Sequence, residues 1–187
     1  MDLIQEHGFD ETTMEQIAET ADVAKGTLYN YFPAKEAIVG EWIRQTSIAR
    51  HTQRLQALPE MAGTRERMVR VFTVLMEGVQ AQKDLFEVFI IHRMQQIVSF
   101  AEEQAEPSGL ELLGQEIIRL GRESGELRRD LPVDALQDMF EAIFIEIAKQ
   151  FYRDPAAFQP ETVIEPMVDL FLNGAYDEAT SDNAGPV

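Results

Sequence analysis

A short run near the N-terminus carries the residue types that bind nucleic acid. Lys25 supplies a positive charge, and Gly26 and Thr27 are small enough to allow a close approach. Tyr29 and Asn30 carry polar groups that can hydrogen-bond phosphate oxygens. A glycine inside a helix costs about 1 kcal/mol relative to alanine. Close contact between the backbone and DNA would explain that cost, so the run predicts phosphate contacts and reading of base edges.

Two short helices joined by a turn are expected to position this run. Thr12 and Thr13 are each followed, three residues later, by Glu or Gln, and both pairs match the capping box that starts a helix. We expect the inward face of that helix to consist of Met14, Ile17, Ala18 and Ala21. Asp22 suits the turn because Asp tolerates the left-handed conformation. A second helix over about residues 24–31 would turn Leu28 inward, with Phe32 one turn on. This pattern predicts a helix-turn-helix, whose second helix enters the major groove.

Two runs resemble the signature of the TetR family of transcriptional regulators: residues 8–13 and residues 25–37. Residues 125–127 and 168–174 also look similar to that family. The resemblance implies base-edge contacts at the start of the second helix and phosphate contacts around them. The DNA-binding residues that it implies are Thr13, Lys25, Gly26, Thr27, Tyr29, Asn30, Tyr31 and Lys35.

Three features depart from the family pattern. Family members usually have a longer segment before the Gly-Phe pair, so we expect a truncated first helix over residues 1–7. Ala24 and Ala34 stand where the family often has a capping side chain, and Asp22 stands where glycine is common. These departures bear on DNA affinity more than on the fold.

Longer helices are expected after Pro33. We predict an all-α fold with a helix-turn-helix domain over residues 1–44, an effector-binding and dimerisation bundle over residues 45–176, and a flexible tail over residues 177–187. The helix over residues 133–151 is apolar on more than one face. The resemblance implies that it forms a four-helix homodimer interface with the helix over residues 160–176.

The resemblance also implies a pocket for a small molecule inside the larger domain. The candidates for its lining are Phe72, Met76, Phe89, Phe140 and Phe144. Plain core packing is the alternative for each of them, since Met and Phe fill cores readily. Glu87, Glu141 and Glu146 interrupt apolar stretches, and we favour solvated helix edges for them over a site for a cationic ligand.

Composition excludes several classes of function. The chain has 33 Asp and Glu against 16 Lys and Arg, a formal net charge of −17, which argues against a general polyanion binder. Cysteine is absent, and no His stands three residues after a Glu, as helical di-iron sites require. We expect no catalysis, no cofactor and no metal. No apolar run reaches the roughly 18 residues of a membrane span, and we expect a cytoplasmic protein.

The sequence therefore predicts a ligand-responsive regulator of transcription. It would be a homodimeric repressor, released from a palindromic double-stranded DNA operator by a small hydrophobic or amphipathic effector. The alternative is a helical homodimer that binds a small molecule and has lost DNA binding.

Overall fold

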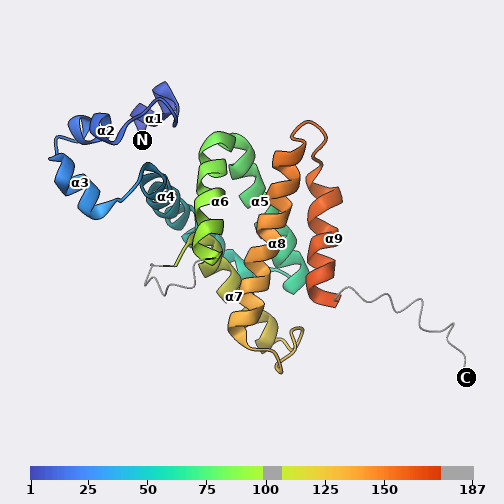
Figure 1. Ribbon diagram of the computed structural model, residues 1–187. Helices are drawn as coiled ribbons and strands as arrows, with labels where there is room; N and C mark the ends of the chain where they lie inside the picture. The colour runs from blue at the N-terminus through green and yellow to red at the C-terminus, as the bar shows by residue number, and fades with distance from the viewer. Residues whose placement is uncertain (99–106, 174–187) are drawn as a thin grey trace, which may run out of the picture. The chain divides into compact units, whose positions relative to one another are not determined.

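The structure, a computed structural model, describes the backbone of residues 1–98 and 107–173, and side chains over residues 1–46, 54–91 and 107–173 (Figure 1). Every regular element in these ranges is helical, which confirms the predicted all-α class. In chain order they are α1 (Asp2–His7), α2 (Met14–Thr20), α3 (Lys25–Tyr31), α4 (Lys35–Ala57), the 3-10 turn η1 (Leu58–Glu60), α5 (Thr64–Ala81), α6 (Lys83–Val98), α7 (Gly109–Glu123), α8 (Val133–Arg153) and α9 (Pro160–Asn173).

The chain forms two compact units. Unit 1 holds Met1–Gln56 and Glu77–Leu112, and unit 2 holds Ala57–Met76 and Leu113–Val187. The predicted domain boundary at residue 44 lies inside α4, and it stays a prediction. The predicted tail over residues 177–187 lies outside the described residues.

Unit 1 is built around two small apolar clusters. In the first, Met14, Ala18 and Leu28 are buried between α2 and α3. The second centres on Ile4, Val39 and Ile43, against which apolar side chains of α6 pack. The first cluster holds α3 in place by its Leu28 face, as the sequence predicts. Ala21 is exposed, so its predicted place on the inward face is wrong.

Unit 2 packs α7, α8 and α9 with the first part of α5. Phe72, Met76 and Phe140 are completely buried, and Ile117 of α7 and Val168 of α9 are buried as fully. Helices α8 and α9 pack side by side (Figure 1). Gly114 lets α7 approach α8, since a Cβ there would lie 2.7 Å from the Phe140 ring.

Glu126 has a structural role in unit 2. Its Oε2 accepts a hydrogen bond of 2.6 Å from the backbone N–H of Thr64 and another from the Thr64 hydroxyl. A carboxylate at this position satisfies an N–H group that the first turn of α5 leaves free. Gly125 makes the preceding turn at φ +79°, and Leu127 is buried against α7 and α8. The run at residues 125–127 therefore fixes the start of α5.

Candidate nucleic-acid interface and effector region

Helix α3 presents a polar, solvent-facing surface. Leu28 is its one buried residue, and Lys25, Gly26, Thr27, Tyr29, Asn30 and Tyr31 are all exposed. Tyr31 has 77% of its surface accessible and Tyr29 has 45%, which is high for aromatic side chains. A Cβ at Gly26 would meet nothing within 4 Å, so this glycine is not required by packing inside the protein. The six residues predicted to contact DNA from this helix thus share one accessible surface.

Only one of the two predicted capping boxes forms. The Thr13 hydroxyl accepts from the backbone N–H of Gln16 at 3.2 Å, and the Gln16 side chain accepts from the backbone N–H of Thr13 at 2.8 Å. Thr12 is buried instead, and its hydroxyl donates to the carbonyl oxygen of Gly8 at 2.7 Å. The prediction of a Thr12–Glu15 box is therefore wrong, because the Thr12 side chain points into unit 1.

The turn between α2 and α3 has the predicted geometry. Asp22 adopts φ 54°, the only positive φ of a non-glycine residue in the part of the chain that the structure describes. Ala24, the residue before α3, makes no side-chain cap. Across this turn, the Lys25 ammonium lies 2.9 Å from a carboxylate oxygen of Glu15, and this hydrogen bond holds the pKa of Glu15 below its usual range. No spacing in the sequence predicts this pair.

Lys35 makes its contacts within unit 1. Its ammonium donates to the carbonyl oxygen of Phe9 at 2.7 Å and to that of Asp10 at 3.4 Å. It also lies 4.5 Å from the centre of the Phe9 ring, within cation–π range. Lys35 is the first residue of α4. Its predicted contact with a phosphate stays a prediction.

Of the five predicted effector residues, three form an aromatic group in unit 2. The ring centres of Phe72 and Phe140 lie 4.8 Å apart, and those of Phe72 and Phe144 lie 6.0 Å apart. Met76 is buried in the same unit. Phe89 belongs to unit 1, where it packs against the cluster around Val39 and Ile43. Lining of a pocket stays a prediction for all five.

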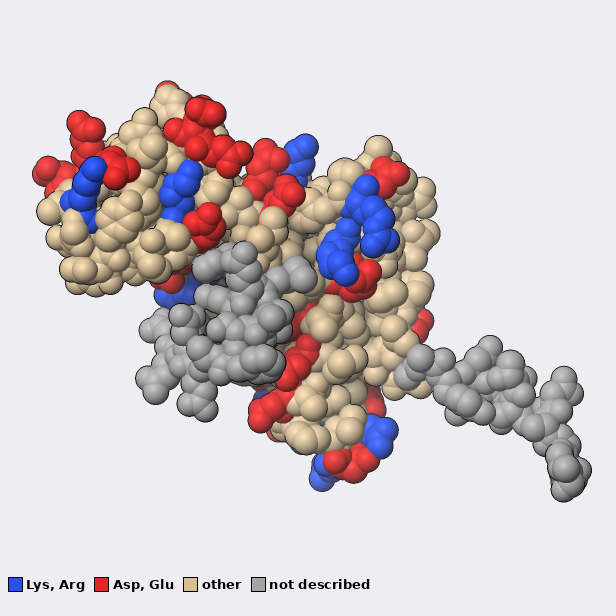
Figure 2. Space-filling model, viewed as in Figure 1, with Lys and Arg blue, Asp and Glu red and all other residues tan. Residues whose placement is uncertain are grey.

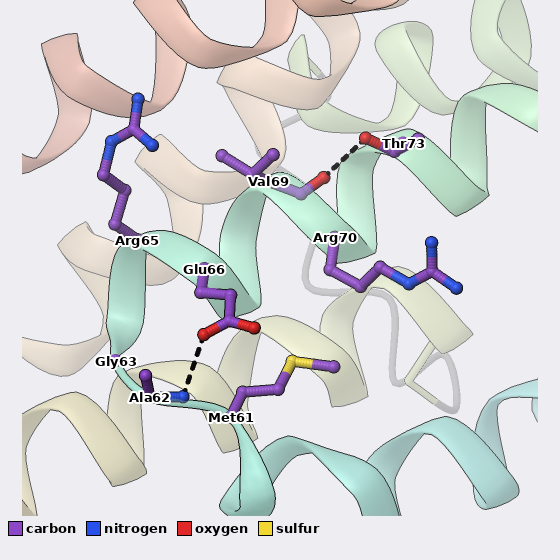
Figure 3. Close-up of a pocket in the computed structure, with 8 residues that line it drawn as sticks. All are labelled: Met61, Ala62, Gly63, Arg65, Glu66, Val69, Arg70 and Thr73. Atoms are coloured by element: carbon purple, nitrogen blue, oxygen red, sulfur yellow. Dashed lines mark hydrogen bonds between the residues drawn. The ribbon is translucent and has the colours of Figure 1, made fainter.

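A groove of about 680 Å³ runs along the start of α5 (Figure 3). Its walls hold none of the five predicted effector residues; they are Met61, Ala62, Gly63, Arg65, Glu66, Val69, Arg70 and Thr73. The Arg65 guanidinium forms ion pairs with Asp169 at 2.7 Å and with Glu165 at 2.9 Å, both on α9. Glu66 accepts from the backbone N–H of Ala62 at 2.9 Å. Two of the charged groups in the groove thus already have partners.

The polar residues of α8 differ from the sequence prediction. Glu141 is only 9% exposed and accepts a hydrogen bond from Gln137, which is also buried, at 3.1 Å. The predicted solvated edge is therefore wrong at Glu141, whereas Glu87 is exposed. Apolar groups instead reach solvent on the other side of α8, where Met139 is 54% exposed. On α9, Leu170 is 42% exposed.

The N-terminal helices are acidic. Residues 1–44 carry three Lys or Arg and nine Asp or Glu. On the face drawn in Figure 2, acidic side chains outnumber basic ones over the N-terminal helices.

None of the described helices is long and apolar enough to cross a membrane. Within the described residues, no three His, Asp or Glu side chains gather in a way that would hold a metal ion.

Known proteins similar to this chain are bacterial regulators of transcription. Residues 1–41 match the model of bacterial regulatory proteins of the tetR family. The HTH-type transcriptional regulator YdeS of Bacillus subtilis (strain 168) is 28% identical over 142 residues, covering 74% of this chain and 68% of YdeS. FadR of Thermus thermophilus, a TetR family transcriptional repressor, is 25% identical with a TM-score of 0.77, covering 100% of this chain and 94% of FadR. The N-terminal part of the chain therefore matches the TetR family, and the whole chain shares its fold with a TetR family repressor.

The TetR fold is shared with further solved structures. FadR from Bacillus subtilis matches with a TM-score of 0.57 and 19% identity, over 94% of this chain and 95% of that FadR. The Thermus thermophilus FadR structure is a complex with lauroyl-CoA, and the Bacillus subtilis one is a complex with stearoyl-CoA. The chain accordingly has the helix-turn-helix element and the fold of TetR-type regulators of transcription, as the sequence predicts. Regulators of this kind bind DNA rather than catalyse reactions.

Proposed function

We propose that this protein is a homodimeric TetR-type repressor that binds a palindromic operator and is released from it by an effector. The observation that carries the DNA-binding part is the exposed surface of α3. Lys25, Gly26 and Thr27 would face base edges, while Tyr29, Asn30 and Tyr31 would bind phosphates. The Thr13 hydroxyl would add a phosphate contact beside its capping role, and Lys35 would add one if its ammonium left Phe9. Such a protein works where the chromosome is, in the cytoplasm.

The exposed apolar side chains of α8 and α9 support the homodimer. Met139 on α8 and Leu170 on α9 face solvent in the single chain, although burying such side chains is favourable. A symmetric dimer through both helices would cover them and hold two copies of α3 about 34 Å apart, one turn of DNA. The interface is checked by Met139→Glu, which should shift the protein to monomer in analytical ultracentrifugation. Leu131→Glu, an exposed apolar position outside these helices, should leave the dimer unchanged.

We propose a long-chain acyl-CoA as the effector class. The lauroyl-CoA complex of Thermus thermophilus FadR, which matches this chain over its full length, supports this class. The aromatic group of Phe72, Phe140 and Phe144 offers an apolar environment for an acyl chain in unit 2. An effector releases DNA only if it binds the two states of the protein with different affinity.

One titration tests these proposals together. A duplex selected by the wild-type protein from a randomised pool is labelled, and binding is followed by fluorescence anisotropy. We expect tight binding that lauroyl-CoA reverses and that neither CoA nor laurate alone reverses. Failure to select any duplex would favour the alternative, a helical homodimer without DNA binding. Selection of a duplex that lauroyl-CoA does not release would contradict the effector class only.

A further inference from the structure

The recognition surface holds a single positive charge. Lys25 is the only Lys or Arg among residues 1–34, which contain seven Asp or Glu. It is the first residue of α3, where the helix dipole already disfavours a cation. Glu15 lies in the first turn of α2, where the dipole of that helix favours an anion. The 2.9 Å ion pair between them thus places each charge against an opposite one at the point where α3 would meet DNA.

The ion pair changes what Lys25 offers to a phosphate. Non-specific DNA binding comes from Lys and Arg side chains that neutralise phosphates and release counterions. Lys25 cannot do this while Glu15 balances its charge, and the Glu15 carboxylate itself repels phosphates. The side chains of Lys25 and Glu15 are 60% and 48% exposed, so DNA can reach both. A random duplex therefore gains little binding free energy from Lys25.

A guanine opposite α3 offers the Lys25 ammonium a different partner. Guanine presents two acceptors, O6 and N7, in the major groove, and a lysine placed opposite them makes a specific contact. In the specific complex the other contacts of α3 would hold the ammonium opposite both acceptors, so that they can replace the carboxylate as its partner. In a random duplex no such contacts hold a phosphate in place beside the ammonium, and the pair with Glu15 at 2.9 Å persists. A glutamate carboxyl is ionised near neutral pH, and the Lys25 hydrogen bond lowers the pKa of Glu15 further.

We propose that Glu15 is a specificity-determining residue. Its ion pair with Lys25 keeps the ammonium from binding phosphates, and only a base-edge acceptor replaces Glu15 as the partner of Lys25. This inference rests on the proposed DNA binding by α3. It explains how a regulator with so acidic an N-terminal unit can still use its one recognition lysine. Removing the carboxylate should raise affinity for random DNA more than affinity for the operator.

The test compares Glu15→Gln with Glu19→Gln. Both variants remove one negative charge from exposed positions of α2, but only the first removes the partner of Lys25. Binding is measured for a random duplex and for the duplex selected by the wild-type protein, each over a series of salt concentrations. For Glu15→Gln we expect about threefold tighter binding of the random duplex, the scale of an exposed ion pair. Its salt slope should steepen by about 0.9, one more neutralised phosphate.

Glu19→Gln should leave the salt slope unchanged, and a Lys25→Met background should abolish the effect of Glu15→Gln, which would support the inference. Identical behaviour of the two Glu→Gln variants, or weaker binding of both duplexes by Glu15→Gln, would overturn it while leaving the proposed function intact. A wild-type protein that binds neither duplex would overturn the proposed function as well.

Discussion

The ammonium nitrogen of Lys35 lies 2.7 Å from the carbonyl oxygen of Phe9 and 4.5 Å from the centre of the Phe9 ring. This contact joins the start of α4 to the turn after α1, across 26 positions of the sequence. The family resemblance implies that Lys35 binds a phosphate, whereas its geometry in the free chain gives it a positioning role. The two roles differ in a measurable way, because a phosphate contact contributes to the salt dependence of DNA binding and an internal contact does not.

Lys35→Met separates these roles. The substitution keeps the apolar stem and removes the charged hydrogen bonds, so we expect a loss of unfolding free energy on the order of 1 kcal/mol in urea denaturation. If the contact with Phe9 persists on DNA, operator affinity should fall by a similar factor at every salt concentration, with an unchanged slope. A slope that becomes shallower by about 0.9 would mean that Lys35 neutralises a phosphate instead. Arginine at this position should keep much of the stability, since it too can donate to Phe9.

Thr13→Ala should destabilise the helix-turn-helix. The Thr13 hydroxyl satisfies the Gln16 N–H, and the loss of such a cap costs about 1 kcal/mol. Thr13→Ser keeps the hydroxyl, and we expect it to be close to the wild type in thermal unfolding followed by circular dichroism. Equal stability of the two variants would argue that the capping box contributes nothing.

The sequence predicts the helices well and the choice among local alternatives less well. The bounds of α3 and α8 lie within two residues of the predicted ranges 24–31 and 133–151, because periodicity and Pro positions indicate both helices. Two overlapping capping boxes fit the sequence equally, and burial of Thr12 against Gly8 decides between them. That burial depends on how the turn after α1 folds back, which no local pattern encodes.

Ion pairs and buried polar groups are hidden from the sequence for a similar reason. Glu15 and Lys25 lie ten positions apart on different helices, so no helical spacing connects them. Gln137, the hydrogen-bond partner of the buried Glu141, lies where α8 packs closely on α7 at Gly114, which has no side chain to hold the helices apart. In both cases the packing of two helices, rather than the pattern of either one, places the charge.

Glu126 should make stability depend on pH. Hydrogen bonds from the Thr64 hydroxyl and the Thr64 backbone N–H lower the pKa of Glu126 below its ordinary value of 4.5. A carboxyl with a lowered pKa in the folded state stabilises the protein above the unfolded-state pKa, and this contribution is lost as pH falls through the folded-state value. We expect the stability of the wild type to drop more steeply than that of Glu126→Gln as the pH falls below about 4.5. Parallel curves from urea denaturation at several pH values would contradict this role of Glu126.

Gly114→Ala should destabilise unit 2 although alanine favours helices. A Cβ at Gly114 would lie 2.7 Å from the Phe140 ring and 2.8 Å from the Gln137 amide, and both side chains are buried. Overpacking of this kind costs about 1–3 kcal/mol, which exceeds the gain of about 1 kcal/mol from replacing a helical glycine.

Gly78→Ala is the matched control for that substitution. Gly78 lies in helix α5, and a Cβ there would meet nothing within 4 Å, so only the gain in helix propensity remains. We expect its unfolding midpoint in urea to rise and that of Gly114→Ala to fall. If both midpoints rose, α7 and α8 would have room to separate, and the close approach at Gly114 would not be what buries Gln137.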